Sequence, residues 1–114
     1  MTTAAPQAPG IERTVIQQHD LSTPGLVMIQ NRVEINPGAP AFRHKHPGEE
    51  VIYVLEGLLE YDIDGQAPVR VSAGEGVTVP AETVHAAINV GGTKAAELAT
   101  YIVEKDKPFL VAVD

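Results

Sequence analysis

The chain alternates short β-branched segments with turn-forming residues almost from end to end, and this alternation limits the folds open to it. Segments such as LVMIQNRVEI, EVIYVLEG and LLEYDID are bounded by glycine, proline or Asp-Gly turns. β-Branched and aromatic residues favour strands, and the turn signals recur too often for a long helical period. The pattern predicts an all-β protein, an antiparallel sandwich or barrel of short strands.

The length of the chain allows one compact core. It has 114 residues, 44% of them hydrophobic, which is the size and composition of a single globular domain. The start of the chain is rich in Ala, Pro, Thr and Gly, which predicts a flexible tail over residues 1–12. No linker or repeat follows, so we expect residues 13–114 to form a single domain.

Composition and charge argue against several classes of function. A net charge of −7 and eight scattered basic residues are unsuited to a nucleic-acid partner. The sequence contains no cysteine, so a metal would have to be held by His, Asp or Glu. No apolar run reaches the roughly 20 residues that span a bilayer, and the start lacks the layout of a signal peptide. We therefore expect a cytoplasmic protein with no membrane partner.

Two histidines one residue apart stand in the segment HKHPGEEVIYVLEG. Because alternate residues of a strand face the same side, His44 and His46 share a face. The Pro-Gly pair after them predicts a hairpin turn, beyond which either Glu49 or Glu50 could join the histidines, since parity does not decide between them. His85 opens a later strand. If that strand lies beside the first, three imidazoles and a carboxylate converge inside the barrel.

These side chains are suited to one kind of ion. Imidazole nitrogen and carboxylate oxygen bind a divalent transition metal ion (Fe, Mn, Ni, Zn or Cu), whereas Ca and Mg prefer oxygen ligands alone. Four protein ligands leave positions open for water, oxygen or substrate. A histidine pair on a strand is also typical of a half-exposed polar strand end, so the pair alone leaves both interpretations open.

Two longer segments resemble the two conserved motifs of the cupin family. GAPAFRHKHPGEEVIYVLEG is similar to the first motif, G(X)5HXH(X)3E(X)6G, and GEGVTVPAETVHAAIN to the second, G(X)5PXG(X)2H(X)3N. Sixteen residues separate them, which is the compact spacing of small single-domain bacterial cupins. The resemblance implies an all-β fold, the double-stranded β-helix or jelly-roll barrel.

The resemblance also implies a ligand set for one metal ion: His44, His46, Glu50 and His85. It thereby favours Glu50 over its neighbour. One position departs from the second motif, because Glu82 stands where the family has glycine. A residue other than glycine there must either adopt a positive φ or form a different turn.

Strand parity predicts further side chains in the barrel interior. Tyr61 is the best candidate for a polar contact, because a buried phenol needs a partner. Asn31 and Arg43 are further polar candidates, His19 is expected in a surface loop, and no catalytic residue distinct from the metal ligands is evident. Core packing explains each of the predicted pocket residues better than substrate contact does. They are Phe42, Ile52, Val54, Tyr61, Ala87 and Asn89.

The resemblance and the apolar pocket together favour a metal-dependent enzyme of the dioxygenase or oxidoreductase type, acting on a small-molecule substrate. Two alternatives stay open: a non-redox isomerase or lyase acting on a sugar or hydroxy acid, and a non-catalytic small-molecule-binding protein. The apolar terminal segments ERTVIQQ and PFLVAVD would leave exposed strand edges. We therefore expect a homodimer, which the resemblance to small cupins also implies.

Overall fold

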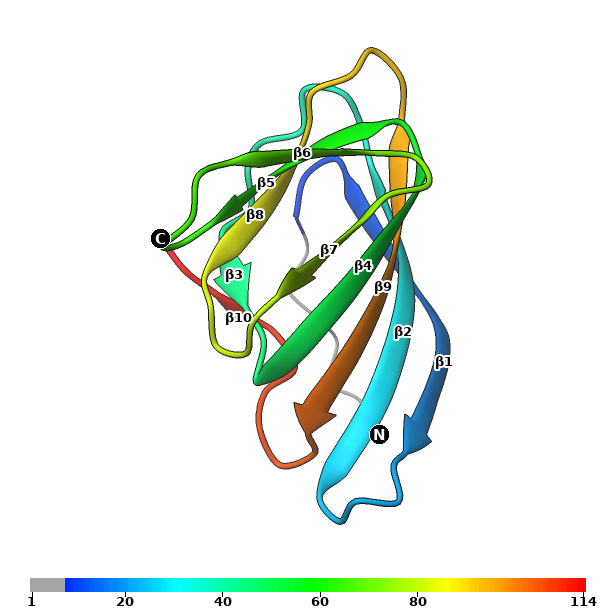
Figure 1. Ribbon diagram of the computed structural model, residues 1–114, viewed down its shortest axis with the longest axis vertical. Helices are drawn as coiled ribbons and strands as arrows, with labels where there is room; N and C mark the ends of the chain where they lie inside the picture. Colours follow the sequence, from blue (N-terminus) through cyan, green and yellow to red (C-terminus); the bar gives the residue numbers. More distant parts are fainter. Residues whose placement is uncertain (1–7) are drawn as a thin grey trace.

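The computed structural model describes residues 8–114, which form ten strands and their connecting turns (Figure 1). The strands are β1 (Ile11–Asp20), β2 (Leu26–Ile35), β3 (His44–Lys45), β4 (Gly48–Glu56), β5 (Leu58–Ile63), β6 (Val69–Ser72), β7 (Gly76–Val79), β8 (His85–Asn89), β9 (Ala95–Glu104) and β10 (Val111–Ala112). No helix among these residues is long and apolar enough to cross a membrane.

The first strand is longer than the sequence suggested. It begins at Ile11, two residues before the expected domain boundary, and residues 1–7 of the predicted tail lie outside the described residues. It also ends later, because His19 is an exposed residue of β1 rather than part of a loop. The chain turns only after Asp20, and β2 pairs antiparallel with β1.

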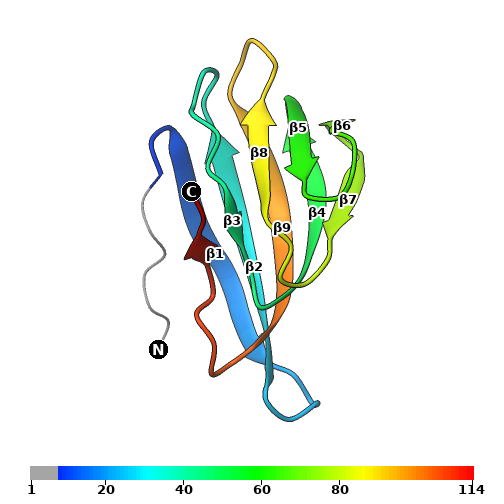
Figure 2. The same ribbon diagram turned by 90° about the vertical axis from the view of Figure 1, so that its left-hand side faces the viewer.

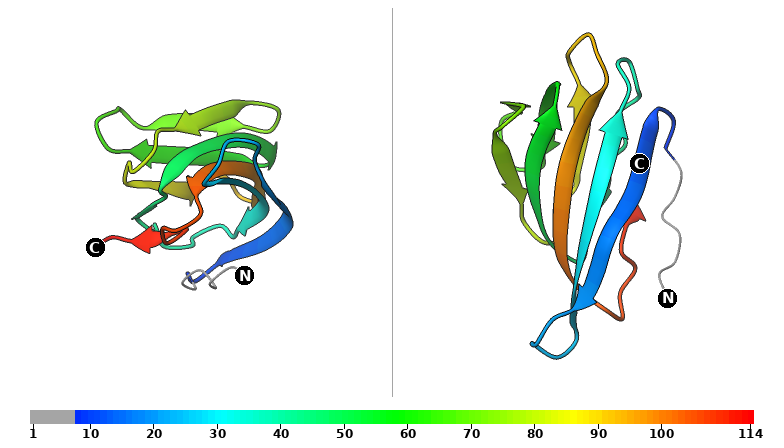
Figure 3. Two further views of the ribbon diagram at one scale, coloured as in Figure 1. Left: turned by 90° about the horizontal axis from the view of Figure 1, so that it is seen from below. Right: turned by 90° about the vertical axis from the view of Figure 1, so that its right-hand side faces the viewer.

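The strands form two five-stranded antiparallel sheets, in the orders β1-β2-β9-β4-β7 and β10-β3-β8-β5-β6. The sheets lie face to face as two layers: Figure 2 looks onto the second sheet with the first behind it, and the left view of Figure 3 shows both from below. The prediction of an all-β jelly-roll fold is confirmed.

Alternating burial along the long strands builds the core between these layers. In β2 every second residue, from Val27 to Ile35, is buried, and β9 repeats the pattern from Ala95 to Val103. This is the expected pattern for a sheet with one face on the core and the other toward solvent. Full burial of one large apolar side chain stabilises a fold by about 1.5–3 kcal/mol, so these faces hold the sheets together.

Two glycines permit close approach of the backbone at the two ends of β4. A Cβ atom on Gly48 would lie 1.8 Å from the carbonyl oxygen of Ile102, so only glycine allows β4 to pair with β9 at this point. Gly57 has a φ of 80° in the tight turn from β4 to β5, and a Cβ there would lie 2.9 Å from that of Ala95. Both positions are therefore fixed by geometry.

The turn that contains Glu82 keeps the positive φ without glycine. The φ of Glu82 is 57°. Among residues 8–114, every other residue with a positive φ is a glycine. The backbone N–H of Glu82 donates to the carbonyl of His46 at 2.9 Å, and its carboxylate lies 3.6 Å from the ammonium of Lys45. The left-handed conformation costs roughly 1–2 kcal/mol, which these contacts partly offset.

Candidate metal centre

Both sheets contribute to the site predicted from the sequence. His44 on β3 lies directly opposite His85 on β8 in one sheet, which is the adjacency that the sequence required. Glu50 reaches the same point from β4 in the other sheet, and His46 lies in the short segment between β3 and β4. Their ligand atoms all lie within 4.8 Å of one another, and all four side chains are buried.

The prediction of a hairpin between β3 and β4 is wrong. β3 and β4 belong to opposite sheets, so the Pro-Gly segment crosses the sandwich instead of folding one strand back on the other. Gly48 is already part of β4 and pairs with Val103 of β9. The crossing carries Glu50 to the facing sheet, where its carboxylate points back at the histidines.

Backbone carbonyls fix the orientation of all three imidazoles. The Nδ1 atoms of His44 and His46 lie 2.8 Å from the carbonyl oxygens of Phe42 and Phe109. The Nδ1 atom of His85 lies 2.9 Å from that of Thr83. Because a carbonyl can only accept a hydrogen bond, each Nδ1 carries the hydrogen. This arrangement directs the three Nε2 atoms toward Glu50 and is typical of histidines that bind a metal.

The Nε2 atoms are placed to bind a metal ion, because hydrogen bonds within the cluster do not satisfy all of them. His85 Nε2 lies 2.9 Å from Glu50 Oε1, and His46 Nε2 lies 3.5 Å from it. His46 Nε2 is buried and has no hydrogen-bond partner. A buried acceptor without a donor is costly, and a divalent cation at this point would satisfy all four ligand atoms. The residues present therefore fit one divalent transition metal ion.

Electrostatics keep two of the histidines neutral. Burial, reinforced by His85 and His46, lowers the pKa of His44 to about 3. Burial also lowers the pKa of His46 to about 4. Neutral imidazole is the form that binds a metal, so these two side chains are ready to ligate at neutral pH.

The remaining two ligands share a proton. Burial raises the pKa of Glu50, but the hydrogen bond from His85 and the electrostatic attraction of the nearby imidazole rings outweigh burial and bring that pKa to about 2. Burial lowers the pKa of His85, but Glu50 outweighs it and raises that pKa overall. The proton between them therefore resides on the imidazole, and a bound cation would replace it.

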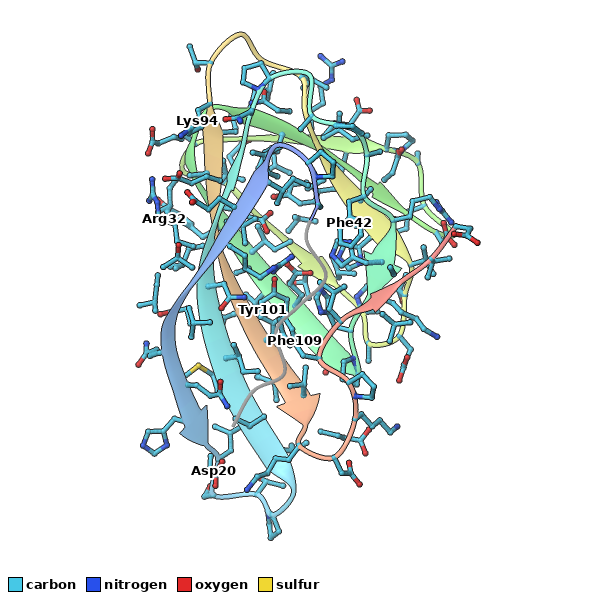
Figure 4. All side chains as sticks on the ribbon, turned by 180° about the vertical axis from the view of Figure 1, so that it is seen from behind. Asp20, Arg32, Phe42, Lys94, Tyr101 and Phe109 are labelled. Atoms are coloured by element: carbon cyan, nitrogen blue, oxygen red, sulfur yellow. The ribbon has the colours of Figure 1, made fainter. Side chains whose placement is uncertain are left out.

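A small cavity adjoins three of the four ligands, His44, Glu50 and His85. Its volume open to water-sized molecules is about 20 Å³, which is room for about one water. Three predicted pocket residues, Phe42, Tyr61 and Ala87, lie on its wall. Figure 4 labels Phe42 together with Tyr101 and Phe109, whose rings contact each other. The full wall comprises Ile11, Arg13, Val33, Ile35, Phe42, His44, Glu50, Tyr61, His85, Ala87 and Glu97.

The other predicted pocket residues lie away from the cavity. Ile52 and Val54 share the inward face of Glu50 but lie farther along β4, where they pack into the core. The amide of Asn89 donates to the carbonyls of Ile35 and Thr93, and so ties the end of β8 to neighbouring segments. Parity gave the correct face for these residues but not their depth along the strand.

Two further polar candidates also lie away from the cavity wall. Arg43 is exposed and faces Asp64 at 3.6 Å. Asn31 is buried, and its side-chain nitrogen and oxygen have no hydrogen-bond partner.

Glu97 and Arg13 were missed by the sequence analysis. Glu97 is buried on β9 and accepts a hydrogen bond from the hydroxyl of Tyr61 at 2.5 Å, which supplies the partner expected for that phenol. Burial, followed by the charge of Glu50, raises the pKa of Glu97 to about 7. Arg13 donates to the hydroxyl of Tyr101 at 2.7 Å. For Glu97 a signal existed, because it shares parity with the buried small and aromatic residues of AAELATYIVE.

The fold and the site together define the class of protein. It is a β-sandwich of two antiparallel sheets, and its interior holds three histidines and one glutamate placed to bind a metal ion. The family model for the cupin domain matches residues 31–103, and the chain belongs to this family. The resemblance seen in the two motifs is thereby confirmed.

Similar proteins carry several different names. The chain is 41% identical over 63 residues to "Polyketide synthase CurC" of Streptomyces cyaneus, and this match covers 54% of the chain but only 40% of that protein. It is 27% identical to an oxalate oxidase in complex with the substrate analogue glycolate, with a TM-score of 0.70 over 99% of the chain and 60% of the oxidase. It is 28% identical to KdgF from Halomonas sp., with a TM-score of 0.61, over 82% of the chain and 81% of KdgF.

Proposed function

We propose that this cupin domain is a metal-dependent enzyme of the dioxygenase or oxidoreductase type that acts on a small organic molecule. The observation that carries the proposal is the convergence of three oriented imidazoles and one carboxylate beside a cavity. His44, His46, Glu50 and His85 would hold one divalent ion. Bound iron or manganese would supply redox chemistry and Lewis acidity at this point.

The rest of the site supports chemistry on an enclosed substrate. Phe42 and Ala87 form part of an apolar wall, which limits the access of water to the reacting atoms. The small cavity favours oxygen or one end of an organic molecule as its occupant. The likeness to an oxalate oxidase over 99% of the chain also supports oxidative chemistry.

Glu97 favours a second candidate function, a non-redox isomerase or lyase. Such reactions need a group that takes up and returns a proton, and a carboxyl with a pKa of about 7 is suited to that role near neutral pH. Glu97 lies on the cavity wall together with Glu50 and His85. Tyr61 holds one of its oxygens by a hydrogen bond and so fixes its orientation.

Metal content and oxygen uptake distinguish the two candidates. The purified protein would be stripped of metal, reloaded separately with iron, manganese or zinc, and assayed with a panel of small organic acids and sugars. Oxygen consumption that depends on substrate and on iron or manganese supports the dioxygenase. Turnover with zinc and without oxygen supports the isomerase or lyase. Protein that binds none of these ions would contradict both.

We also propose that the protein is a homodimer in solution. β1 is an edge strand of its sheet, and its side chains Val15 and Ile16 are 55% and 52% exposed. An apolar edge of this kind favours association with a second copy.

A further inference from the structure

Arg13 places a positive charge in the wall of the metal-site cavity. It extends from β1, the edge strand, and lines the cavity together with Glu50 and Glu97. One of its terminal nitrogens donates to the hydroxyl of Tyr101 at 2.7 Å, and the guanidinium carbon lies 5.9 Å from the centre of the Phe109 ring. These contacts hold the guanidinium in place beside the predicted metal ligands.

The hydrogen-bonding capacity of this guanidinium is only partly used. A guanidinium has five N–H donors arranged in a planar fork that matches a carboxylate. Arg13 makes one hydrogen bond to a side chain, and no carboxylate within residues 8–114 forms an ion pair with it. Glu50 and Glu97 attract the guanidinium through space without forming an ion pair with it, so its unused donors remain available to the carboxylate of a ligand.

Other residues of the cavity wall select a different part of the ligand. Ile11, Phe42 and Ala87 are partly exposed, so they lie toward the opening, whereas Val33 and Ile35 are buried behind them. This part of the wall is apolar and suits a hydrocarbon group. The small volume, about 20 Å³, limits what enters fully to one end of a molecule.

We propose that the ligand of this site is a small carboxylate with an apolar body. Its carboxylate pairs with Arg13 beside the metal ligands, and its hydrocarbon part contacts Ile11, Phe42 and Ala87. The inference rests on the proposed function and narrows it, because it favours an organic acid over a neutral sugar. The combined charge of a divalent ion and Arg13 exceeds that of Glu50 and Glu97 together, which also favours an anion.

Three small probes that differ in charge or in length test the proposal without any assay of turnover. Protein labelled with ¹⁵N and loaded with zinc, which is diamagnetic and redox-inert, is titrated with butyrate, butyramide and acetate, and amide chemical shifts give each Kd. We expect butyrate to bind at least tenfold more tightly than butyramide because of the ion pair. We expect it to bind about tenfold more tightly than acetate, because two more methylene groups are buried. Equal Kd values for butyrate and butyramide would overturn the proposal.

Variants identify the residue responsible. Arg13→Gln should weaken butyrate about tenfold and leave butyramide unchanged, and Arg13→Lys should recover part of the loss. Arg70→Gln serves as the matched control, because Arg70 is exposed and pairs with Glu60 on the surface. A purely structural role for Arg13 would weaken both probes equally and would contradict the inference. Should Arg13→Gln fail to fold, the comparison of butyrate with butyramide on metal-free wild type, where no zinc attracts the carboxylate, still decides.

Zinc stoichiometry, measured on every sample, separates this inference from the proposed function. Protein that binds one zinc but does not distinguish butyrate from butyramide contradicts only the carboxylate inference. Protein that binds no zinc contradicts the metal site. In that case titration of the metal-free protein still tests the pairing of butyrate with Arg13.

Discussion

Tyr61 on β5 donates a hydrogen bond to Glu97 on β9 across 2.5 Å, and this contact joins the two sheets at the wall of the cavity. Burial, followed by the charge of Glu97, raises the pKa of Tyr61, so the phenol keeps its proton and remains the donor. One oxygen of Glu97 is thus committed to Tyr61. The carboxyl is held in a fixed orientation whether or not it is protonated.

Replacing Glu97 by Gln should change how stability depends on pH. The pKa of Glu97 is about 7 in the folded protein against an ordinary value of 4.5, so between these values the folded state binds more protons than the unfolded state. Wild-type protein therefore loses stability as pH rises through this range, and Glu97→Gln does not. Relative to the free energy of unfolding of the wild type, that of Glu97→Gln should rise by about 2 kcal/mol from pH 5 to pH 8.

Urea unfolding of the metal-free proteins at both pH values measures this difference. Glu49→Gln is the control, because Glu49 is exposed on the outer face of β4 and should follow the wild type. The contributions of the histidines are present in all three proteins and cancel. Identical pH dependence of Glu97→Gln and wild type would show that Glu97 does not hold a proton in the folded state.

Metal binding should stabilise the protein only when Glu50 is intact. A ligand that binds the folded state alone, present at a hundred times its Kd, stabilises a protein by about 2.7 kcal/mol. We expect zinc to raise the free energy of unfolding of wild type and of Glu49→Gln by this amount, and to have little effect on Glu50→Gln. The two glutamates are adjacent but face opposite sides of β4. An equal effect of zinc on both variants would place the metal elsewhere.

The affinity for metal should decrease as pH falls, with one proton exchanged per ion. The His85–Glu50 pair holds a proton on the imidazole, and its release accompanies metal binding. Below the raised pKa of His85 we therefore expect the affinity to fall about tenfold per pH unit. The pKa values of His44 and His46, about 3 and 4, keep these residues neutral until much lower pH.

Calorimetric titration with zinc in buffers of different ionisation enthalpy counts the released protons between pH 5.5 and 7.5. A count near one below the pKa of His85 agrees with the shared proton. Affinity that does not vary over this range would contradict the ligand assignment.

Glu82→Gly should stabilise the protein. Glycine adopts a positive φ without the steric cost of a Cβ atom, and the lost contact with Lys45 is an exposed ion pair that contributes little. We expect a gain of about 1 kcal/mol in the free energy of unfolding, measured by urea titration. Glu82→Ala also loses the ion pair but retains the strained φ, so it should gain nothing. Equal stability of the two variants would show that the turn is not strained.

The sequence indicated the four side chains that cluster in the structure better than it indicated the cavity around them. His44, His46, Glu50 and His85 stand at fixed spacings in two motifs, and strand parity alone places the first two on one face. Parity does not state which strand of the opposite sheet faces a residue, nor how deep along its strand it lies. The hairpin prediction and the placement of Ile52 and Val54 in the pocket failed for this reason.

Arg13 shows the limit most clearly. Its strand reaches the cavity only because β1 pairs with β2 as the outermost strand of the sheet, and its hydroxyl partner Tyr101 lies 88 positions away in the chain. Such long-range relations depend on the order of strands in the sheets. Neither composition nor periodicity encodes that order, so the chemistry of the cavity wall could be derived only from the structure.

The proposed homodimer should dissociate when a charge is placed on β1. Ile16 lies at an irregularity in the pairing of β1 with β2, between Val15 and Gln17, and its side chain is exposed next to that of Val15. If this apolar edge faces a second copy, Ile16→Lys leaves an unpaired charge in the interface and should shift the mass from dimer to monomer. Val69→Lys, at an exposed apolar position on β6 of the other sheet, should remain dimeric. Light scattering on all three proteins measures the masses, and a monomeric wild type would contradict the proposal.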